Sequence, residues 1–192
     1  MKKTTKKMID RRTLYTQNVI KEAFLQVKQM KSYNAITVAE LCREAEISRG
    51  TFYRHYSNIA EVLDELIEEM LSEVSSLLVH LSLTGEVQCG IPFCHFIREN
   101  QKYRCIIMDD TLTSYIIDKG TKFFMGDFEA YMMEHTTLPR EQIESIYYFQ
   151  ISGCFTIAKR YARMSKGDWC SIQKTIDTFI KNGLKSYMQQ TE

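Results

Sequence analysis

Residues 36–56, ITVAELCREAEISRGTFYRHY, are the stretch of sequence that decides the fold. The spacing of its apolar residues predicts two short helices joined by a tight turn. Thr37 and Ser48 each precede one of these helices, where a hydroxyl oxygen can accept a hydrogen bond from an unpaired amide of the first turn. Phe52 and Tyr56 lie four residues apart, so they share the buried side of the second helix. The stretch therefore predicts a helix-turn-helix.

The second helix of this motif also indicates what the motif binds. Its other side carries cationic and hydrogen-bonding side chains, namely Arg49, Thr51, Tyr53, Arg54 and His55. A helix that is apolar on one side and carries such residues on the other fits the major groove of DNA, where they contact base edges and phosphates. We therefore expect a DNA-binding protein.

The distribution of charge supports this interpretation independently. Residues 1–56 contain twelve Lys and Arg against five Asp and Glu, a formal charge of +7, whereas residues 57–192 carry a formal charge of −6. A localised positive region is expected of a protein that binds phosphates, and the net charge of +1 conceals it. The basic arm before the first helix either solubilises the chain or, as we expect here, adds nonspecific affinity for DNA.

The remaining composition argues against several other classes of protein. No apolar run approaches the ~18 residues of a membrane span, and the N-terminus lacks the apolar segment of a secretory signal, so we expect a cytoplasmic protein. The six cysteines form neither a C-x-x-C pair nor a zinc-ligand array, and we predict no metal site and no cofactor. We interpret the cysteines as small buried side chains; redox sensing by Cys89, Cys94 or Cys105 is the alternative.

An enzymatic function is not expected. The sequence contains no glycine-rich phosphate loop, no recognisable nucleophile–base arrangement and no paired-carboxylate motif. Cys94 and His95 are adjacent, but neighbouring residues on a helix point about 100° apart and cannot form a dyad alone.

Helical periodicity runs through the whole chain, which has two prolines and eight glycines. We expect an all-α protein of about nine helices, with an N-terminal three-helix helix-turn-helix domain followed by a helical C-terminal domain. The clearest interruption of the pattern is at 82–90. Besides the two helices of the motif, the predicted helices span about residues 12–30, 58–80, 92 onward, 101–108, 111–135 and 139–164. A last helix begins at residue 168, and we expect Asp168 to cap its N-terminus. We interpret the acidic side of the helix at 58–80 as solvated: Glu61, Asp64, Glu65, Glu68, Glu69 and Glu73.

This arrangement resembles the TetR family of bacterial transcriptional regulators. The resemblance is specific over residues 10–66, and the matching residues are Asp10-Arg-Arg-Thr13, Ile20, Ala23-Phe24, Ile36-Thr-Val38, Ala45, Ile47 to Tyr56, and Leu63. Beyond residue 66 the chain is similar to regulators related to those of dihydroxyacetone kinase operons, on the run from Ala158 to Gly167.

The resemblance implies a ligand-responsive repressor. It implies a homodimer whose last two long helices pair with their symmetry mates, a palindromic double-stranded DNA operator, and an effector pocket in the C-terminal domain. The domains would then be 1–57, a basic arm and DNA-binding domain with the motif at 37–56, and 58–192, for effector binding and dimerisation. The alternative is a DNA-binding co-activator or architectural protein controlled by a protein partner.

Carried over by position, the resemblance also implies particular DNA contacts. Thr37 should touch a phosphate, and Arg49, Gly50 and Thr51 should approach base edges. Tyr53 and His55 should hold flanking phosphates. For His55 the alternative is a surface residue without a role. Ser48 and Arg54 complete the predicted DNA-binding set. For the effector, we predict an apolar or aromatic molecule bound by six residues, each of which could instead be plain core: Phe96, Met108, Tyr115, Phe123, Phe124 and Tyr147.

The sequence departs from the family pattern at two positions. Glu46 stands where the turn normally has glycine, and a left-handed backbone there costs a non-glycine residue about 1–2 kcal/mol. Ile59 stands where a lysine is usual, which removes an expected cationic phosphate contact. We therefore expect weaker or redirected DNA binding, with Arg54 and the basic arm as compensation.

Overall fold

The computed structural model describes residues 11–84 and 93–188, without the side chains of residues 77–84, 93–95 and 166. Within these ranges the chain forms nine α-helices and two short 3₁₀ helices. The described residues also form one isolated β-bridge, between Thr136 and Met188. The prediction of an all-α protein of about nine helices is confirmed. No helix in the described ranges is long and apolar enough to cross a membrane.

Some sequence predictions concern residues that the structure does not describe. Of the predicted basic arm, Lys2, Lys3, Lys6 and Lys7 lie outside the described residues, whereas Arg11 and Arg12, which we also placed in the arm, begin the helix Arg11–Met30. The expected interruption falls mainly at residues 85–92, which include Cys89 and Pro92 and are also outside the described set. The side chains of Cys94 and His95 are also outside the described set.

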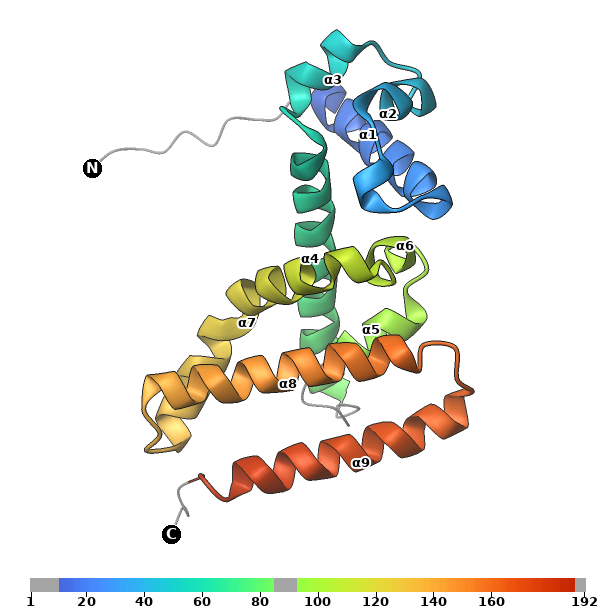
Figure 1. The fold of residues 1–192 in the computed structure, drawn as a ribbon. Helices are drawn as coiled ribbons and strands as arrows, with labels where there is room; N and C mark the ends of the chain where they lie inside the picture. The colour runs from blue at the N-terminus through green and yellow to red at the C-terminus, as the bar shows by residue number, and fades with distance from the viewer. Residues whose placement is uncertain (1–10, 85–92, 189–192) are drawn as a thin grey trace, which may run out of the picture. The chain divides into compact units, whose positions relative to one another are not determined.

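The chain divides into two compact units, Met1–Glu68 and Glu69–Glu192. The helices of the first unit enclose a small core in which Phe24, Leu41 and Phe52 are fully buried. These residues come from three different helices, so the core holds the helix-turn-helix against the first helix. The elements, shown in Figure 1, are α1 (Arg11–Met30), η1 (Tyr33–Ala35), α2 (Val38–Glu44), α3 (Arg49–His55) and the start of α4 (Ile59–Thr84).

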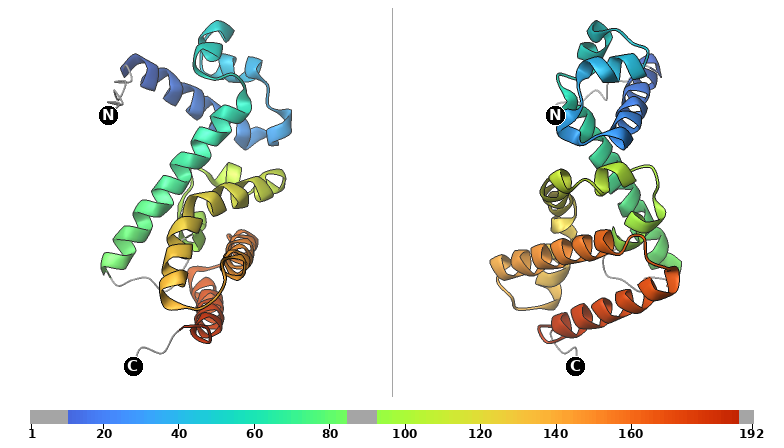
Figure 2. Two further views of the ribbon diagram at one scale, coloured as in Figure 1. Left: turned by 90° about the vertical axis from the view of Figure 1, so that its left-hand side faces the viewer. Right: turned by 45° about the vertical axis from the view of Figure 1, so that its right-hand side comes forward.

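The second unit is built around α8. Helices α5 and α7 pack against α8, and α9 follows α8 in the opposite direction beside it (Figures 1 and 2). Ile116 of α7 and Ile143, Ile151 and Phe155 of α8 are buried. The elements are the rest of α4, α5 (Phe93–Glu99), α6 (Arg104–Ile107), η2 (Asp110–Leu112), α7 (Thr113–His135), α8 (Arg140–Arg160) and α9 (Lys166–Lys185).

The prediction that Asp168 caps the last helix is wrong. The cap is Ser165, whose side chain accepts a hydrogen bond from the Asp168 amide at 3.3 Å and donates one to the Asp168 carboxylate at 2.6 Å. Asp168 is the third residue of the helix, where a carboxylate near the positive helix end is also favourable. Both residue types are good caps, so only the backbone distinguishes them.

The turn before α9 is held by an arginine from another helix. Arg98 of α5 donates hydrogen bonds of 2.9 Å to the carbonyl oxygens of Tyr161 and Met164, and its guanidinium lies 5.1 Å from the ring centre of Trp169. Carbonyls at a helix C-terminus lack partners within the helix, and a cation favours that end. The helix α8 ends at Arg160, four residues before the predicted end, and Arg98 bonds the carbonyls of the turn that follows.

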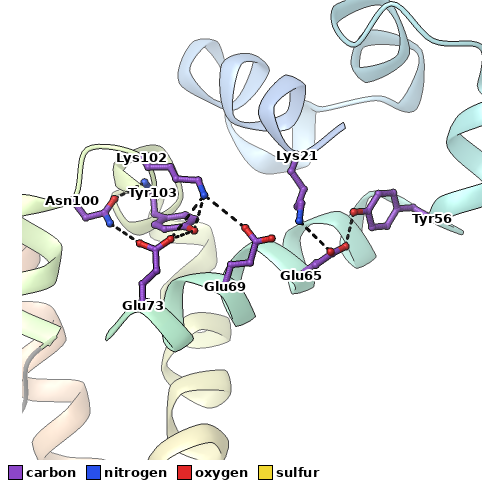
Figure 3. A network of polar contacts seen from close by, with 8 residues as sticks. All are labelled: Lys21, Tyr56, Glu65, Glu69, Glu73, Asn100, Lys102 and Tyr103. Carbon is purple, nitrogen blue, oxygen red and sulfur yellow. Dashed lines mark hydrogen bonds and ion pairs between the residues drawn. The ribbon is translucent and has the colours of Figure 1, made fainter. Parts of the chain in front are cut away.

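The prediction that the acidic side of α4 is only solvated is wrong, because several of its carboxylates bond other parts of the chain. In the first unit, Glu65 accepts hydrogen bonds from the Lys21 ammonium at 3.1 Å and from the Tyr56 hydroxyl (Figure 3). The Lys21 side chain is 7% exposed. A buried cation needs a partner, so Glu65 is a structural residue of the first unit.

In the second unit, two further carboxylates of α4 contact the segment between α5 and α6. Glu73 accepts hydrogen bonds from the Tyr103 hydroxyl at 2.8 Å and from the Asn100 amide at 3.2 Å (Figure 3). Glu69 lies 3.7 Å from the Lys102 ammonium. Tyr103 is fully buried. Burying that ring requires a partner for its hydroxyl, and Glu73 supplies it.

Candidate nucleic-acid interface

The first helix of the motif begins with a reciprocal cap. The Thr37 hydroxyl oxygen accepts from the Glu40 amide at 3.3 Å, and the Thr37 amide and hydroxyl donate to the Glu40 carboxylate at 3.0 and 2.8 Å. Hydrogen bonds to Glu40 from the Lys31 ammonium, and then from Thr37, lower the pKa of this carboxyl to about 2. The capping role predicted for Thr37 is confirmed. A phosphate arriving at this exposed helix end would compete with the Glu40 carboxylate for the same donors.

The turn between the two helices contains the strained residue that the sequence predicts. Glu46 has φ of 52°, the only positive φ at a non-glycine position among the described residues. The amide of the following residue, Ile47, donates to the carbonyl of Cys42 at 2.9 Å, which closes the turn. Ile47 is half-buried beneath it. The packing of the turn therefore offsets the backbone cost of about 1–2 kcal/mol at Glu46.

The second helix of the motif, α3, is fixed from below by its aromatic residues. Phe52 is fully buried and Tyr56 is 4% exposed, and their ring centres lie 6.0 Å apart. Ser48 caps the helix by accepting from the Thr51 amide at 3.0 Å, as predicted. Since the buried face is set by these anchors, the opposite face of α3 is directed to solvent.

The exposed face of α3 carries the residues that the sequence assigned to DNA. Arg49, Gly50, Tyr53 and Arg54 are exposed, and Thr51 and His55 are half-exposed. Tyr53 keeps 57% of its surface in solvent while the edge of its ring meets Phe52 at 5.4 Å. Two guanidinium groups, two hydroxyl groups and an imidazole therefore lie along one short helix and are at least partly open to solvent.

Gly50 has no structural need to be glycine within the chain. A Cβ atom built there would come no nearer than 3.7 Å to another atom, the Ser48 hydroxyl oxygen, which is an ordinary contact. The backbone at this position is helical. The missing side chain therefore matters only for something that approaches α3 from outside, such as the edge of a base pair.

Three side chains of α3 are linked by hydrogen bonds. Arg54 donates from Nε to the Gly50 carbonyl at 3.3 Å and from Nη2 to the Thr51 hydroxyl oxygen at 3.2 Å. The Thr51 and Ser48 hydroxyl oxygens lie 3.0 Å apart, within hydrogen-bond distance. Arg54 is thus folded along its own helix.

The start of α4, where the family pattern places a lysine, is closed by other residues. Ile59 is half-buried, and the Asn58 side chain accepts from the Glu61 amide at 3.0 Å. Glu61 in turn accepts from the Ser57 amide at 2.7 Å. A carboxylate therefore occupies the helix end at which a lysine would otherwise add positive charge.

Sequence reasoning missed the Lys21–Glu65 pair that supports this interface. The signal was present in the first helix, where Lys21, Leu25 and Lys28 recur at helical spacing and are all buried. Lysines at buried positions of an amphipathic helix indicate carboxylate or carbonyl partners.

The six predicted effector residues lie at different depths in the second unit. Phe96 and Tyr147 are buried, Met108 and Phe124 are half-buried, and Tyr115 and Phe123 are exposed. Phe96 stacks on Tyr103, whereas Tyr147 contacts Phe128 at a ring-centre distance of 5.0 Å. Three open hollows are lined by residues of α8, α9 and the segment that follows α9, and none of the six contributes to them. The effector set stays a prediction.

The fold and this face define a helix-turn-helix DNA-binding regulator, and comparison with known proteins gives the family. The family described as "Bacterial regulatory proteins, tetR family" matches residues 22–66. The chain is 31% identical over 133 residues to the HTH-type dhaKLM operon transcriptional activator DhaS of Lactococcus lactis subsp. lactis (strain IL1403), covering 62% of this chain and 71% of that one. The chain therefore belongs to the TetR family of transcriptional regulators, a family without enzymatic activity.

Two further similarities are narrower in what they establish. The chain is 36% identical over 81 residues to the uncharacterized HTH-type transcriptional regulator YxbF of Bacillus subtilis (strain 168), and this match spans 42% of the chain but only 21% of that relative. The solved structure of a TetR transcriptional regulator from Streptococcus agalactiae 2603V superposes with a TM-score of 0.60 at 19% identity, covering 88% of this chain and 96% of that one. The latter likeness shows the fold.

Proposed function

We propose that the protein is a homodimeric repressor in the cytoplasm that binds a near-palindromic operator and releases it when an effector binds. The exposed cationic face of α3, fixed by the buried rings of Phe52 and Tyr56, is the observation that carries this proposal. One helix of seven residues offers little contact surface, so useful affinity needs two copies. Two recognition helices about 34–36 Å apart would read successive major grooves.

Within each half-site we assign the DNA contacts by exposure and chemistry. Arg49, Gly50 and Thr51 face the bases, because they occupy the first turn of α3 and Gly50 has no side chain to hold the backbone away. The remaining residues of the set either contact the DNA backbone or hold another residue of the set in place: Thr37, Ser48, Tyr53, Arg54 and His55. Residues 1–57 would be the DNA-binding domain and residues 58–192 the effector-binding and dimerisation domain.

Exposed apolar side chains on α8 and α9 support the dimer. Phe149 and Phe179 are 67% and 66% exposed, and together they border the hollow between the two helices. Tyr148 of α8 and Tyr187, just after α9, are also half-exposed. Large apolar side chains gathered in this way indicate a protein–protein interface, and the same face on a second copy is the simplest partner.

Activation of transcription is the second candidate. The relative that matches 62% of this chain is named a transcriptional activator. An activator controlled by a protein partner would use an exposed apolar surface, whereas a ligand-responsive repressor would use an enclosed cavity. A reporter gene placed behind the selected operator distinguishes the two, since loss of the protein raises expression under repression and lowers it under activation.

The proposed DNA contacts are tested by two substitutions measured against specific and nonspecific duplexes. Arg49→Ala should lose about 1–3 kcal/mol of binding free energy and relax the base preference, if Arg49 reads a guanine. Tyr53→Phe should weaken binding to all sequences alike, because a phosphate contact carries no sequence information. Unchanged operator selectivity in Arg49→Ala would remove it from the set of base-reading residues. A footprint without dyad symmetry, occupied by a single protomer, would contradict the dimeric operator complex.

A further inference from the structure

We propose that Arg54 is a positioning residue that sets the base preference of α3 through the Thr51 hydroxyl, and not through a phosphate contact of its own. This inference rests on the proposed DNA-binding function. It starts from two contacts: Arg54 donates from Nη2 to the Thr51 hydroxyl oxygen at 3.2 Å and from Nε to the Gly50 carbonyl at 3.3 Å.

The two contacts hold the guanidinium along the helix. Arg54 follows Gly50 by four residues and Thr51 by three, so both acceptors lie on the same helix face as the arginine. A planar guanidinium bonded at two of its nitrogens has a defined orientation, which a lysine ammonium cannot reproduce. The side chain is otherwise exposed.

The arginine restricts what the threonine can offer to a base. A hydroxyl group has one hydrogen and two lone pairs, whereas a guanidinium only donates. Arg54 therefore consumes one lone pair of the Thr51 oxygen, and the Thr51 amide consumes one lone pair of the Ser48 oxygen at 3.0 Å. The two hydroxyls lie 3.0 Å apart and share one further hydrogen bond.

Either direction of that shared bond leaves one hydroxyl hydrogen unused. If Thr51 donates to Ser48, the Ser48 hydrogen is available; if Ser48 donates to Thr51, the Thr51 hydrogen is available. The positive charge of Arg54 beside the pair also repels donor groups. Three of the four lone pairs of the two hydroxyl oxygens are then occupied, and the charge of Arg54 disfavours donor groups at the fourth. The Ser48–Thr51 pair thus offers chiefly its free hydrogen, which matches base acceptors such as guanine O6 and N7, thymine O4 or adenine N7.

Without Arg54, the Thr51 hydroxyl regains a lone pair and can rotate. Such a hydroxyl accepts from the amino groups of adenine and cytosine as readily as it donates to the acceptors, so it no longer discriminates among bases. Arg54 therefore determines specificity without touching a base.

The test compares base selection and salt dependence in the full-length chain. Wild type and Arg54→Lys are each used to select binding sequences from a randomised DNA duplex pool, and Kd is then measured for the selected duplex and its single-base variants over a range of salt concentrations. Arg54→Lys keeps the charge but loses the two-point contact. We expect discrimination at one base position to fall about tenfold, with an unchanged salt slope.

Matched variants separate positioning from a phosphate contact. Thr51→Val removes the hydroxyl at nearly constant shape and should lose the same discrimination, and Thr51→Ser should retain it. Arg54→Lys combined with Thr51→Val should be no worse than Thr51→Val alone, because both changes remove one linked contact. Arg43→Lys on α2, also exposed, controls for the loss of an arginine near the motif.

Three results would overturn the inference, and a fourth would overturn the proposed function on which it rests. Full discrimination in Arg54→Lys, or additive losses in the double variant, would show that Arg54 does not act through Thr51. A salt slope reduced by about one in Arg54→Gln, with discrimination intact, would make Arg54 a phosphate ligand. If wild type selects no sequence from the pool, the proposed DNA-binding function itself fails.

Discussion

The exposed face of α3 in the first unit and the exposed sides of α8 and α9 in the second carry different kinds of side chain. In the first unit the exposed face of α3 is cationic and polar, and large apolar residues such as Phe52 are buried beneath it. In the second unit, Phe149 of α8 and Phe179 of α9 are about two-thirds exposed. A cationic face suits a polyanion in water, whereas an apolar face gains free energy only when another apolar surface covers it. The difference is the one expected if, as we propose, the first unit binds DNA and the second pairs with another copy of the chain.

The two units also differ in the range over which their polar contacts act. In the first unit, most contacts of the interface join residues three or four positions apart, as in Thr37 with Glu40 and Arg54 with Thr51. In the second, the carboxylate of Glu73 meets Tyr103 and the guanidinium of Arg98 meets Tyr161, thirty and sixty-three positions away. Local contacts follow from helix geometry, whereas distant ones need the packed fold.

The largest expected effect is the loss of the aromatic anchor below α3. Phe52→Ala leaves a cavity in a small core and should cost about 3–5 kcal/mol of the free energy of unfolding of the first unit. Urea unfolding followed by circular dichroism measures this change. Tyr53→Phe, at the exposed neighbouring position, should stay within about 0.5 kcal/mol of wild type. Equal losses at the two positions would contradict the assignment of a buried and an exposed face to α3.

The next effect concerns the ion pair between α1 and α4. Lys21→Met should cost about 2 kcal/mol, because it leaves Glu65 without the ammonium, and the partial exposure of Glu65 moderates the loss. Lys31→Met is the matched control: it also breaks a lysine–glutamate pair of the first unit, but one whose lysine side chain is 31% exposed. We expect less than about 1 kcal/mol for the control. A larger loss for Lys31→Met in urea unfolding would reverse our ranking of the two pairs.

A smaller effect is expected in the second unit at the arginine that holds the turn before α9. Arg98→Lys keeps the charge but cannot bond two carbonyls and lie over Trp169 in the same geometry, so it should cost about 1–2 kcal/mol. Hydrogen exchange at the amides of residues 161–169 should accelerate. Arg163→Lys, in the same turn but exposed, should leave exchange unchanged. If both variants exchange alike, the contacts of Arg98 do not stabilise the turn.

The smallest effect is a dependence on alkaline pH. Burial raises the pKa of Tyr147 to about 12, so this phenol keeps its proton in the folded state at pH values where the unfolded chain, with a tyrosine pKa of about 10, has lost it. Its contribution to stability is complete below pH ~10 and is lost as the pH rises toward ~12. Tyr147→Phe should make the fall in unfolding free energy over that range less steep. Tyr131→Phe, at an exposed position, should alter the slope less.

Most of the first unit could be predicted from the sequence, because its signals are local. The caps at Thr37 and Ser48, the left-handed Glu46 and the buried pair Phe52 and Tyr56 all follow from spacings of one to four residues, and the structure agrees with each. The Arg54–Thr51 contact has the same spacing, but an exposed arginine has many rotamers, and the pattern alone does not choose among them.

The sequence by itself determined that the chain is helical, where the motif lies, and that its charge is concentrated before residue 57, because these properties depend on residue type and short-range periodicity. Only the tertiary structure decided which carboxylates of α4 are structural, that Arg98 stabilises the turn before α9, and which apolar side chains of α8 and α9 stay exposed. Each of these features requires residues far apart in the chain to come within hydrogen-bond or van der Waals distance. Local sequence patterns do not predict such contacts.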